Sequence, residues 1–184
     1  MTMSSFTGID NVSRIIDPSP SKIVYSYGEY QQLFCNYPHL IFYDGLPDMN
    51  SFDGSEPMLL TIDDLMQEIN EIVMNLFTKG SHHRNVSITY LAQNMFPKNK
   101  FARIMSLNAH YMIRFKNPRD ASQFAILAKQ MYTKRSQFAV EAYKDATQEP
   151  YSYLLVNLRP KQHDDLCLRT NIFPGETHYV YTAK

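Results

Sequence analysis

The stretch Met58-Leu59-Leu60-Thr61-Ile62-Asp63-Asp64-Leu65-Met66 decides the fold, because an apolar run ends in two adjacent carboxylates. The apolar run predicts a buried strand over residues 58–62. Apolar residues at helical spacing then predict a helix from Asp63 or Asp64 to about Lys79. These residues are Leu65, Ile69, Ile72, Val73 and Leu76. Paired acids at such a junction are typical of magnesium sites in nucleotide-hydrolysing enzymes. They are equally typical of a helix cap whose charge complements the helix dipole, so both interpretations stay open.

Length and composition favour one compact domain of ordinary globular type. The chain has 184 residues, 18 of them basic and 18 acidic, so its formal net charge is zero. This balance argues against a purely electrostatic nucleic-acid binder but not against a local basic patch. Its two cysteines, Cys35 and Cys167, have no metal-ligand spacing around them. The polar N-terminus and the absence of a long apolar run predict a soluble intracellular protein without membrane contact, in the nucleus or the cytoplasm.

Alternating strand and helix patterns predict an α/β fold with a mainly parallel sheet. The predicted strands cover residues 22–27, 40–43, 58–62, 86–92, 111–115 and 151–158, with a last strand or arm over 166–173. Besides the helix to Lys79, helices are predicted over 29–36, 101–107, 120–130 and 135–146. This pattern predicts one domain over 22–176, between polar tails at 1–21 and 177–184.

Polar residues follow two of the predicted strands at the end where parallel sheets carry their chemistry. Asp63 and Asp64 end one strand, and Gln93 ends the next. Asp63 suits a Mg²⁺ ligand, Asp64 a base or water-orienting group facing a phosphate, and Gln93 a group that positions the water. A metal nuclease that uses Glu68 together with the two aspartates is a weaker alternative, because it leaves Gln93 unexplained.

Several segments, in order along the chain, resemble consecutive motifs of the FtsK/HerA-type DNA-packaging ATPases. The resemblance extends to the packaging ATPases of Polinton-like and adintovirus-like elements, which are relatives of the poxvirus packaging ATPase. The segments are Leu59–Met66, Phe77–Ser87, Tyr90–Asn94, Ser106–Tyr111, Phe115–Gln123, Tyr151–Pro160 and Leu168–Glu176. The resemblance covers about Lys22 to Glu176. It implies a P-loop NTPase fold with a RecA/FtsK-like ASCE core, in a ring-forming homo-oligomer that moves double-stranded DNA with ATP and Mg²⁺.

The resemblance also implies roles for individual residues. Asp63 and Asp64 match the Walker B pair, with Asp in place of the more general Glu at the second position. Gln93 matches the polar residue at the end of the fourth strand. Arg84 is a candidate arginine finger acting on a neighbouring subunit, and Arg119 is the second candidate.

One part of the family pattern is missing from this sequence. The family cradles phosphates with a glycine-rich loop that ends Gly-Lys-Ser/Thr. Gly8 is the only glycine before Lys22, and the pair Lys79-Gly80 has the reverse order. The resemblance therefore predicts an incomplete copy that lacks the first core strand and the Walker A loop. Such a copy is not expected to bind ATP tightly alone, and its role would require assembly with a full-length homologue.

A non-catalytic DNA-binding or subunit-interaction module is the alternative function. The middle of the chain is moderately basic, and Phe101 and Tyr132 are interleaved with the cations. These are Lys98, Lys100, Arg103, Arg114, Lys116, Arg119, Lys134 and Arg135. Such a patch follows a phosphate backbone or is simply a solvated face. The candidate DNA contacts are Lys98, Lys100, Arg103 and Lys116.

Overall fold

The computed structural model of the chain describes residues 9–48, 52–65, 67–80, 85–95, 98–118 and 121–183. The chain divides into two compact units, whereas the sequence predicted one domain over 22–176. Val12–Asn108 forms the N-terminal unit. Ala109–Lys184, together with Met1–Asn11, forms the C-terminal unit.

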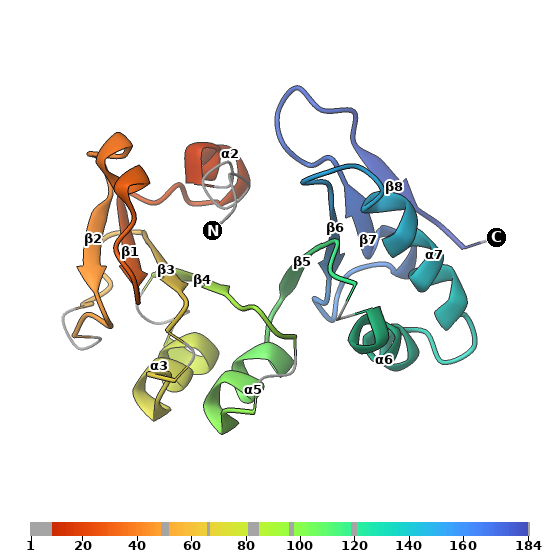
Figure 1. Ribbon diagram of the computed structural model, residues 1–184, viewed down its shortest axis with the longest axis horizontal. Coiled ribbons are helices and arrows are strands. Elements are labelled where there is room, and N and C mark those ends of the chain that lie inside the picture. The colour runs from red at the N-terminus through yellow and green to blue at the C-terminus, as the bar shows by residue number, and fades with distance from the viewer. Residues whose placement is uncertain are drawn as a thin grey trace. The chain divides into compact units, whose positions relative to one another are not determined.

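The N-terminal unit contains a four-stranded sheet in which all pairings are parallel, in the order β2-β1-β3-β4 (Figure 1). Its strands are β1 (Lys22–Tyr27), β2 (Ile41–Asp44), β3 (Met58–Asp63) and β4 (Val86–Leu91). Tyr27 of β1 pairs with Asp44 on one side and Asp63 on the other, and Asp63 pairs with Leu91. The prediction of an α/β fold with a parallel sheet is confirmed for this unit.

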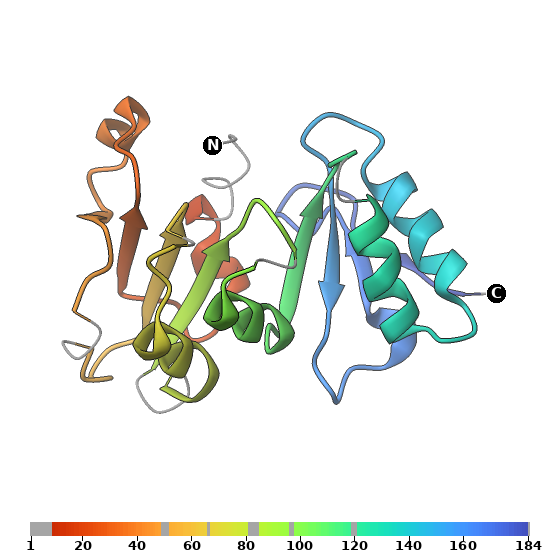
Figure 2. The same ribbon diagram turned by 60° about the horizontal axis from the view of Figure 1, so that its bottom comes forward.

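Helices of the N-terminal unit lie on one side of its sheet (Figure 2). They are α3 (Glu71–Asn75), the π-helix η3 (Leu76–Gly80) and α5 (Lys100–Leu107). Leu60 and Ile62 of β3 are completely buried in the same core cluster as Val73 and Met105 of these helices. Burying each such side chain stabilises the fold by about 1.5–3 kcal/mol. The remaining helical elements of the unit are α2 (Val12–Ile15) and the 3₁₀ helix η1 (Gln32–Asn36).

The helix after β3 begins later than the sequence predicted. Asp64 has a left-handed backbone conformation, with φ of 55°, and turns the chain out of the strand. The helix starts only at Glu71, and the side chain of Asn70 caps it by accepting hydrogen bonds from the amides of Ile72 and Val73. The prediction of a helix from Asp63 or Asp64 is therefore wrong, and neither aspartate caps this helix.

The C-terminal unit contains a second four-stranded sheet, in the order β5-β6-β7-β8, in which all pairings are antiparallel. Its strands are β5 (Tyr111–Phe115), β6 (Tyr153–Asn157), β7 (Leu168–Thr170) and β8 (Tyr179–Tyr181). Two helices, α6 (Ala121–Met131) and α7 (Ser136–Ala146), cover one face of this sheet (Figure 2), and the 3₁₀ helix η4 (Asp164–Leu166) precedes β7. The prediction of a mainly parallel sheet is wrong for these strands, because the pair of helices returns the chain so that β6 runs opposite to β5.

The helices of both units are short. The longest, α6 and α7, have 11 residues each, whereas a membrane-spanning helix needs about 20. In the part of the chain that the structure describes, no helix combines the length and apolar character needed to cross a membrane.

Candidate functional site

The carboxyl edge of the parallel sheet brings together the polar residues that end β3 and follow β4. Asp63 is the last residue of β3 and pairs with Leu91, the last residue of β4. The Nε2 atom of Gln93 donates a hydrogen bond of 3.1 Å to Oδ1 of Asp64. The prediction that these strand ends converge is confirmed. The amide thus holds one oxygen of the Asp64 carboxylate, and Asp64 is exposed at the edge of the sheet.

The Asp63 carboxylate is held from the neighbouring strand. The hydroxyl of Tyr25 on β1 donates a hydrogen bond of 2.9 Å to Oδ2 of Asp63. Tyr25 is completely buried, and its ring packs against Phe34 and Phe42 at centroid distances of 5.6 and 5.7 Å. Because the aromatic packing fixes the ring, the hydrogen bond fixes the orientation of the carboxylate.

Burial and charge both act on the ionisation of these groups. Burial of Asp63 raises its pKa, the hydrogen bond from Tyr25 lowers it, and the neighbouring Asp64 charge raises it again. Burial also raises the pKa of Tyr25, as does the charge of Asp63. Burial and the charge of Asp64 raise the pKa of Tyr90 on β4. Asp63 therefore carries an electrostatic penalty in its ionised form that a bound cation would offset.

The site lies at a point where the order of strands reverses. From β1 the chain moves outward to β2 and then returns to the other side of β1 to form β3. In open parallel sheets the crevice outside the carboxyl ends at such a point is where ligands bind. Gly28, directly after β1, approaches this crevice closely, since its amide donates to the Asp63 carbonyl at 3.2 Å. A Cβ at Gly28 would lie 3.0 Å from the Asp64 carbonyl oxygen, so a larger residue would press on the backbone of Asp64.

Asp63 and Asp64 are the two carboxylates at the carboxyl end of β3. In the described ranges, no cluster of three or more His, Cys, Asp and Glu side chains is arranged to hold a metal ion. Mg²⁺ is commonly held by one or two carboxylates, with water and phosphate oxygens completing its octahedron. The nuclease hypothesis placed Glu68 one helical turn past the two aspartates. No helix joins them, and Glu68 lies in a turn in which its amide donates to the Leu65 carbonyl.

The other candidate residues are divided between the units or lie outside the described residues. Arg84 and Arg119, the two arginine-finger candidates, fall outside the residues that the structure describes. Among the DNA-contact candidates, Lys98, Lys100 and Arg103 are exposed in the N-terminal unit, and Lys116 is exposed in the C-terminal unit. Lys100 places its Nζ 5.8 Å from the ring centroid of Phe101. The basic middle of the chain is therefore shared by two units.

Sequence reasoning missed Tyr25 and Gly28. Both belong to the strand and turn that precede the acidic pair by more than thirty residues. The signal available was the end of a β-branched and aromatic strand at a glycine. That pattern indicates a strand end but does not identify which neighbouring strand it meets.

Comparison with protein-family models, with curated proteins and with solved structures finds no match to this chain. The candidate site is therefore defined by its geometry. Buried Tyr25 donates a hydrogen bond to the Asp63 carboxylate, the Gln93 amide donates one to Asp64, and the Gly28 amide donates one to the Asp63 carbonyl.

Proposed function

We propose that the carboxyl edge of the parallel sheet binds Mg²⁺ together with the phosphate oxygens of a nucleoside triphosphate, as in the DNA-packaging ATPases that the sequence resembles. The observation that carries the proposal is the 3.1 Å hydrogen bond from Gln93 to Asp64 at the ends of adjacent parallel strands. Asp63 is the metal ligand. Asp64 orients the attacking water, and Gln93 holds Asp64 in place and senses the phosphate. Phosphoryl transfer depends mainly on such positioning and charge neutralisation.

The alternative explanation, in which the acidic pair caps the following helix, does not fit the position of that helix. The helix begins at Glu71, and Asn70 caps it. Asp64 also has a left-handed conformation, which is uncommon outside glycine although Asp tolerates it better than most residues. A carboxylate in that conformation, bonded to a side chain across the sheet and capping no helix, is better explained by a ligand.

The sequence contains no Gly-Lys-Ser/Thr loop. The chain therefore offers a nucleotide the proposed metal site but no phosphate-binding loop. In the proposed function the chain therefore acts inside an assembly that moves double-stranded DNA. It works with a homologue that carries a Gly-Lys-Ser/Thr loop and supplies it to the assembly. The isolated chain is expected to bind divalent cations and to bind Mg-ATP weakly.

A titration with Mn²⁺, monitored by electron paramagnetic resonance, tests the metal site. Wild-type chain is expected to bind Mn²⁺, and Asp63→Asn to lose that binding. Asp53→Asn is the matched control, because Asp53 is an exposed carboxylate whose hydrogen bonds to Ser55 an amide oxygen can keep. Equal Mn²⁺ binding by wild type and Asp63→Asn would overturn the proposal. Micromolar calorimetric affinity of the isolated chain for Mg-ATP would contradict the need for a supplied phosphate loop.

DNA binding without catalysis is the second candidate function, and the distribution of charge favours it. The C-terminal unit contains eleven basic and eight acidic residues, and the N-terminal unit contains seven and ten. The zero net charge of the chain is thus the sum of an acidic unit and a basic unit. Salt-dependent retention on DNA that is lost when Lys116 of the basic unit is reversed in charge would support this function, and reversal of Lys98, Lys100 and Arg103 tests the candidates in the acidic unit separately. No retention at low salt would exclude it.

A further inference from the structure

One face of β5 exposes a row of apolar side chains. Tyr111, Ile113 and Phe115 are 50%, 44% and 37% exposed, and the residues between them are less exposed. Side chains alternate between the faces of a strand, so these three share one face. The other face lies against α6 and α7, since Tyr181, on that face of β8, donates a hydrogen bond to Asp145 of α7. The exposed row therefore lies on the face of the sheet that the helices do not cover.

A strained turn adds a third aromatic ring to this region. The Ser152 amide donates to the Glu149 carbonyl at 3.3 Å, and the Ser152 hydroxyl donates to the same carbonyl at 2.7 Å. Tyr151 has φ of 65° within this turn, directly after Pro150. A proline followed by a residue with positive φ is the arrangement of a type II turn, in which glycine is the favoured residue. A tyrosine there is strained, and the residue is 69% exposed.

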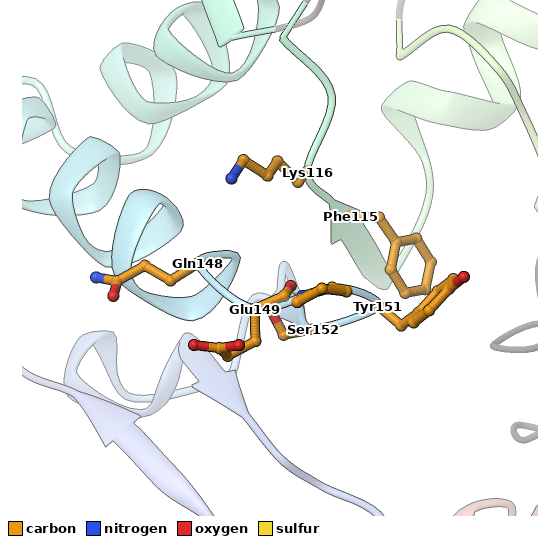
Figure 3. Close-up of a pocket in the computed structure, with 7 residues that line it drawn as sticks. Phe115, Lys116, Gln148, Glu149, Tyr151 and Ser152 are labelled. Atoms are coloured by element: carbon orange, nitrogen blue, oxygen red, sulfur yellow. Dashed lines mark hydrogen bonds between the residues drawn. The ribbon is translucent and has the colours of Figure 1, made fainter.

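Phe115 and Tyr151 line a common pocket of about 460 Å³. The other lining residues are Lys116, Gln148, Glu149, Pro150 and Ser152. In Figure 3 the rings of Phe115 and Tyr151 lie at one end of the pocket, and Gln148 and Glu149 lie toward the other. The volume falls in the range of small-ligand sites, and two aromatic walls suit a flat ring.

Contacts within the unit hold Phe115 and Tyr111 in place. The Tyr143 hydroxyl of α7 donates to the Phe115 carbonyl at 2.9 Å and accepts from the Asn117 amide at 3.2 Å. The ring of Phe115 packs edge-to-face on Tyr153 at 6.1 Å. At the other end of β5, Nη1 of Arg159 donates to the Tyr111 hydroxyl at 3.3 Å. The row of rings thus has a cation at each end, Arg159 at Tyr111 and Lys116 at Phe115.

We propose that Tyr111, Phe115 and Tyr151 form a stacking platform for single-stranded nucleic acid. Bases stack on the three rings, and Lys116 and Arg159 meet the phosphates between them. Aromatic side chains on a sheet face, with cations along the strand path, are a general means of binding unpaired bases. The net positive charge of the C-terminal unit favours this partner. The same charge disfavours a second copy of the chain as the partner. If the β5 faces of two copies met, Lys116 and Arg159 of one copy would lie close to those of the other, and these like charges would repel.

Fluorescence anisotropy with a labelled oligothymidine at low salt tests the platform. Phe115→Ala and Tyr151→Gly are each expected to weaken binding about tenfold or more. Tyr151→Gly also relieves the positive φ, so its melting temperature is expected to stay equal or rise, which separates lost binding from lost folding. Tyr179→Ala is the matched control, since Tyr179 is 54% exposed on β8 and lies on the other face by its pairing with Thr170. Lys116→Gln is expected to reduce the slope of log affinity against log salt concentration by about one, because one phosphate contact is lost.

Three results would overturn the platform. One is unchanged affinity of Phe115→Ala and Tyr151→Gly with retained folding. A second is tighter binding of a duplex than of the single strand of the same sequence. The third is a dimer in analytical ultracentrifugation that Phe115→Ala dissociates, which would make this face an interface between copies. None of these results bears on the Mn²⁺ titration of Asp63.

Discussion

The hydroxyl of Tyr25 donates a hydrogen bond of 2.9 Å to Oδ2 of Asp63, joining the interior of β1 to the last residue of β3. The donor is completely buried, whereas the acceptor lies at the edge of the sheet. A rigid core residue thus sets the direction of a carboxylate that we assign to the metal. The orientation of Asp63 therefore depends on packing as well as on the strand that carries it.

Tyr25→Phe keeps the aromatic packing and removes the hydrogen bond to Asp63. We expect Mn²⁺ affinity to fall about tenfold, since hydrogen bonds to charged groups contribute about 1.5–3 kcal/mol. The melting temperature should fall by several degrees, because the folded state loses the same bond. Electron paramagnetic resonance measures the affinity. Tyr43→Phe, at an exposed tyrosine of β2, is the control and should bind as wild type does. Full Mn²⁺ affinity in Tyr25→Phe would show that the carboxylate orients itself without this bond.

Asp63→Asn is expected to stabilise the fold at neutral pH while it removes the cation site. Burial raises the pKa of Asp63 in the folded state above its ordinary value of 3.8. A raised pKa means that the stabilising protonated form is lost as pH rises through the folded value, so the ionised carboxylate opposes folding at pH 7. Urea unfolding without divalent cations should show a gain of about 0.5–2 kcal/mol. The gain should vanish below about pH 3.8, where wild type is protonated in both states. A loss of stability at pH 7 would contradict this account.

Gly28→Ala is expected to disturb the acidic pair through its backbone. The added Cβ would lie 3.0 Å from the Asp64 carbonyl oxygen and 3.5 Å from Cδ2 of Leu65. We expect a loss of about 1–3 kcal/mol in unfolding free energy and weaker Mn²⁺ binding. Gly175→Ala is the comparison, because its φ of 91° strains alanine while nothing lies within 4 Å of the new Cβ. It should lose stability and keep full cation affinity, and the same behaviour from Gly28→Ala would remove Gly28 from the site.

Tyr153 should make the C-terminal unit sensitive to alkaline pH. Burial, with the nearby charge of Glu176, raises the pKa of Tyr153 from 10.0 to about 12. Its stabilising contribution is complete below pH 10 and is lost between pH 10 and about 12. Thermal unfolding of Tyr153→Phe should therefore decline less steeply than wild type over that interval. At pH 7 the variant should be less stable, because the Ile172 amide loses its acceptor. Parallel alkaline curves for both proteins would contradict the assignment.

Sequence periodicity predicted the strands well and their partners poorly. The bounds of β1 and β5 agree with the prediction. A run of β-branched and aromatic residues that stops at turn residues predicts both ends of a strand. The helix after β3 begins later than predicted. Leu65 and Ile69 are four residues apart, and a turn closed by a backbone hydrogen bond between them buries both residues as well as a helix would. The reversal of β6 was missed although both helices before it were predicted, because an alternation of strand and helix patterns does not state the direction in which a strand runs. The three residues of β8 were too short to stand out from a polar tail.

The candidate site was predictable to the extent that it lies at strand ends. Asp63, Asp64 and Gln93 meet because parallel strands end at a common edge, and that rule operates on sequence alone. The contact from Tyr25 joins residues that are not register partners, since Tyr25 pairs with Thr61. Such a diagonal contact depends on the twist of the sheet and on the ring packing of Phe34 and Phe42. No periodicity in the sequence encodes it.

The uniformly parallel sheet has a consequence for how the chain reaches its native state. Each pairing of β1, β3 and β4 requires a crossover connection, so long loops must close before the first inter-strand bonds form. The C-terminal unit has a closure at least as long, since its register partners Tyr111 and Asn157 lie farther apart in the sequence than Lys22 and Met58. We therefore expect refolding in two kinetic phases, one for each unit. Asp63 and Gln93 come together only in the phase of the N-terminal unit, so a divalent cation should change the unfolding rate of that phase and leave the other unaltered.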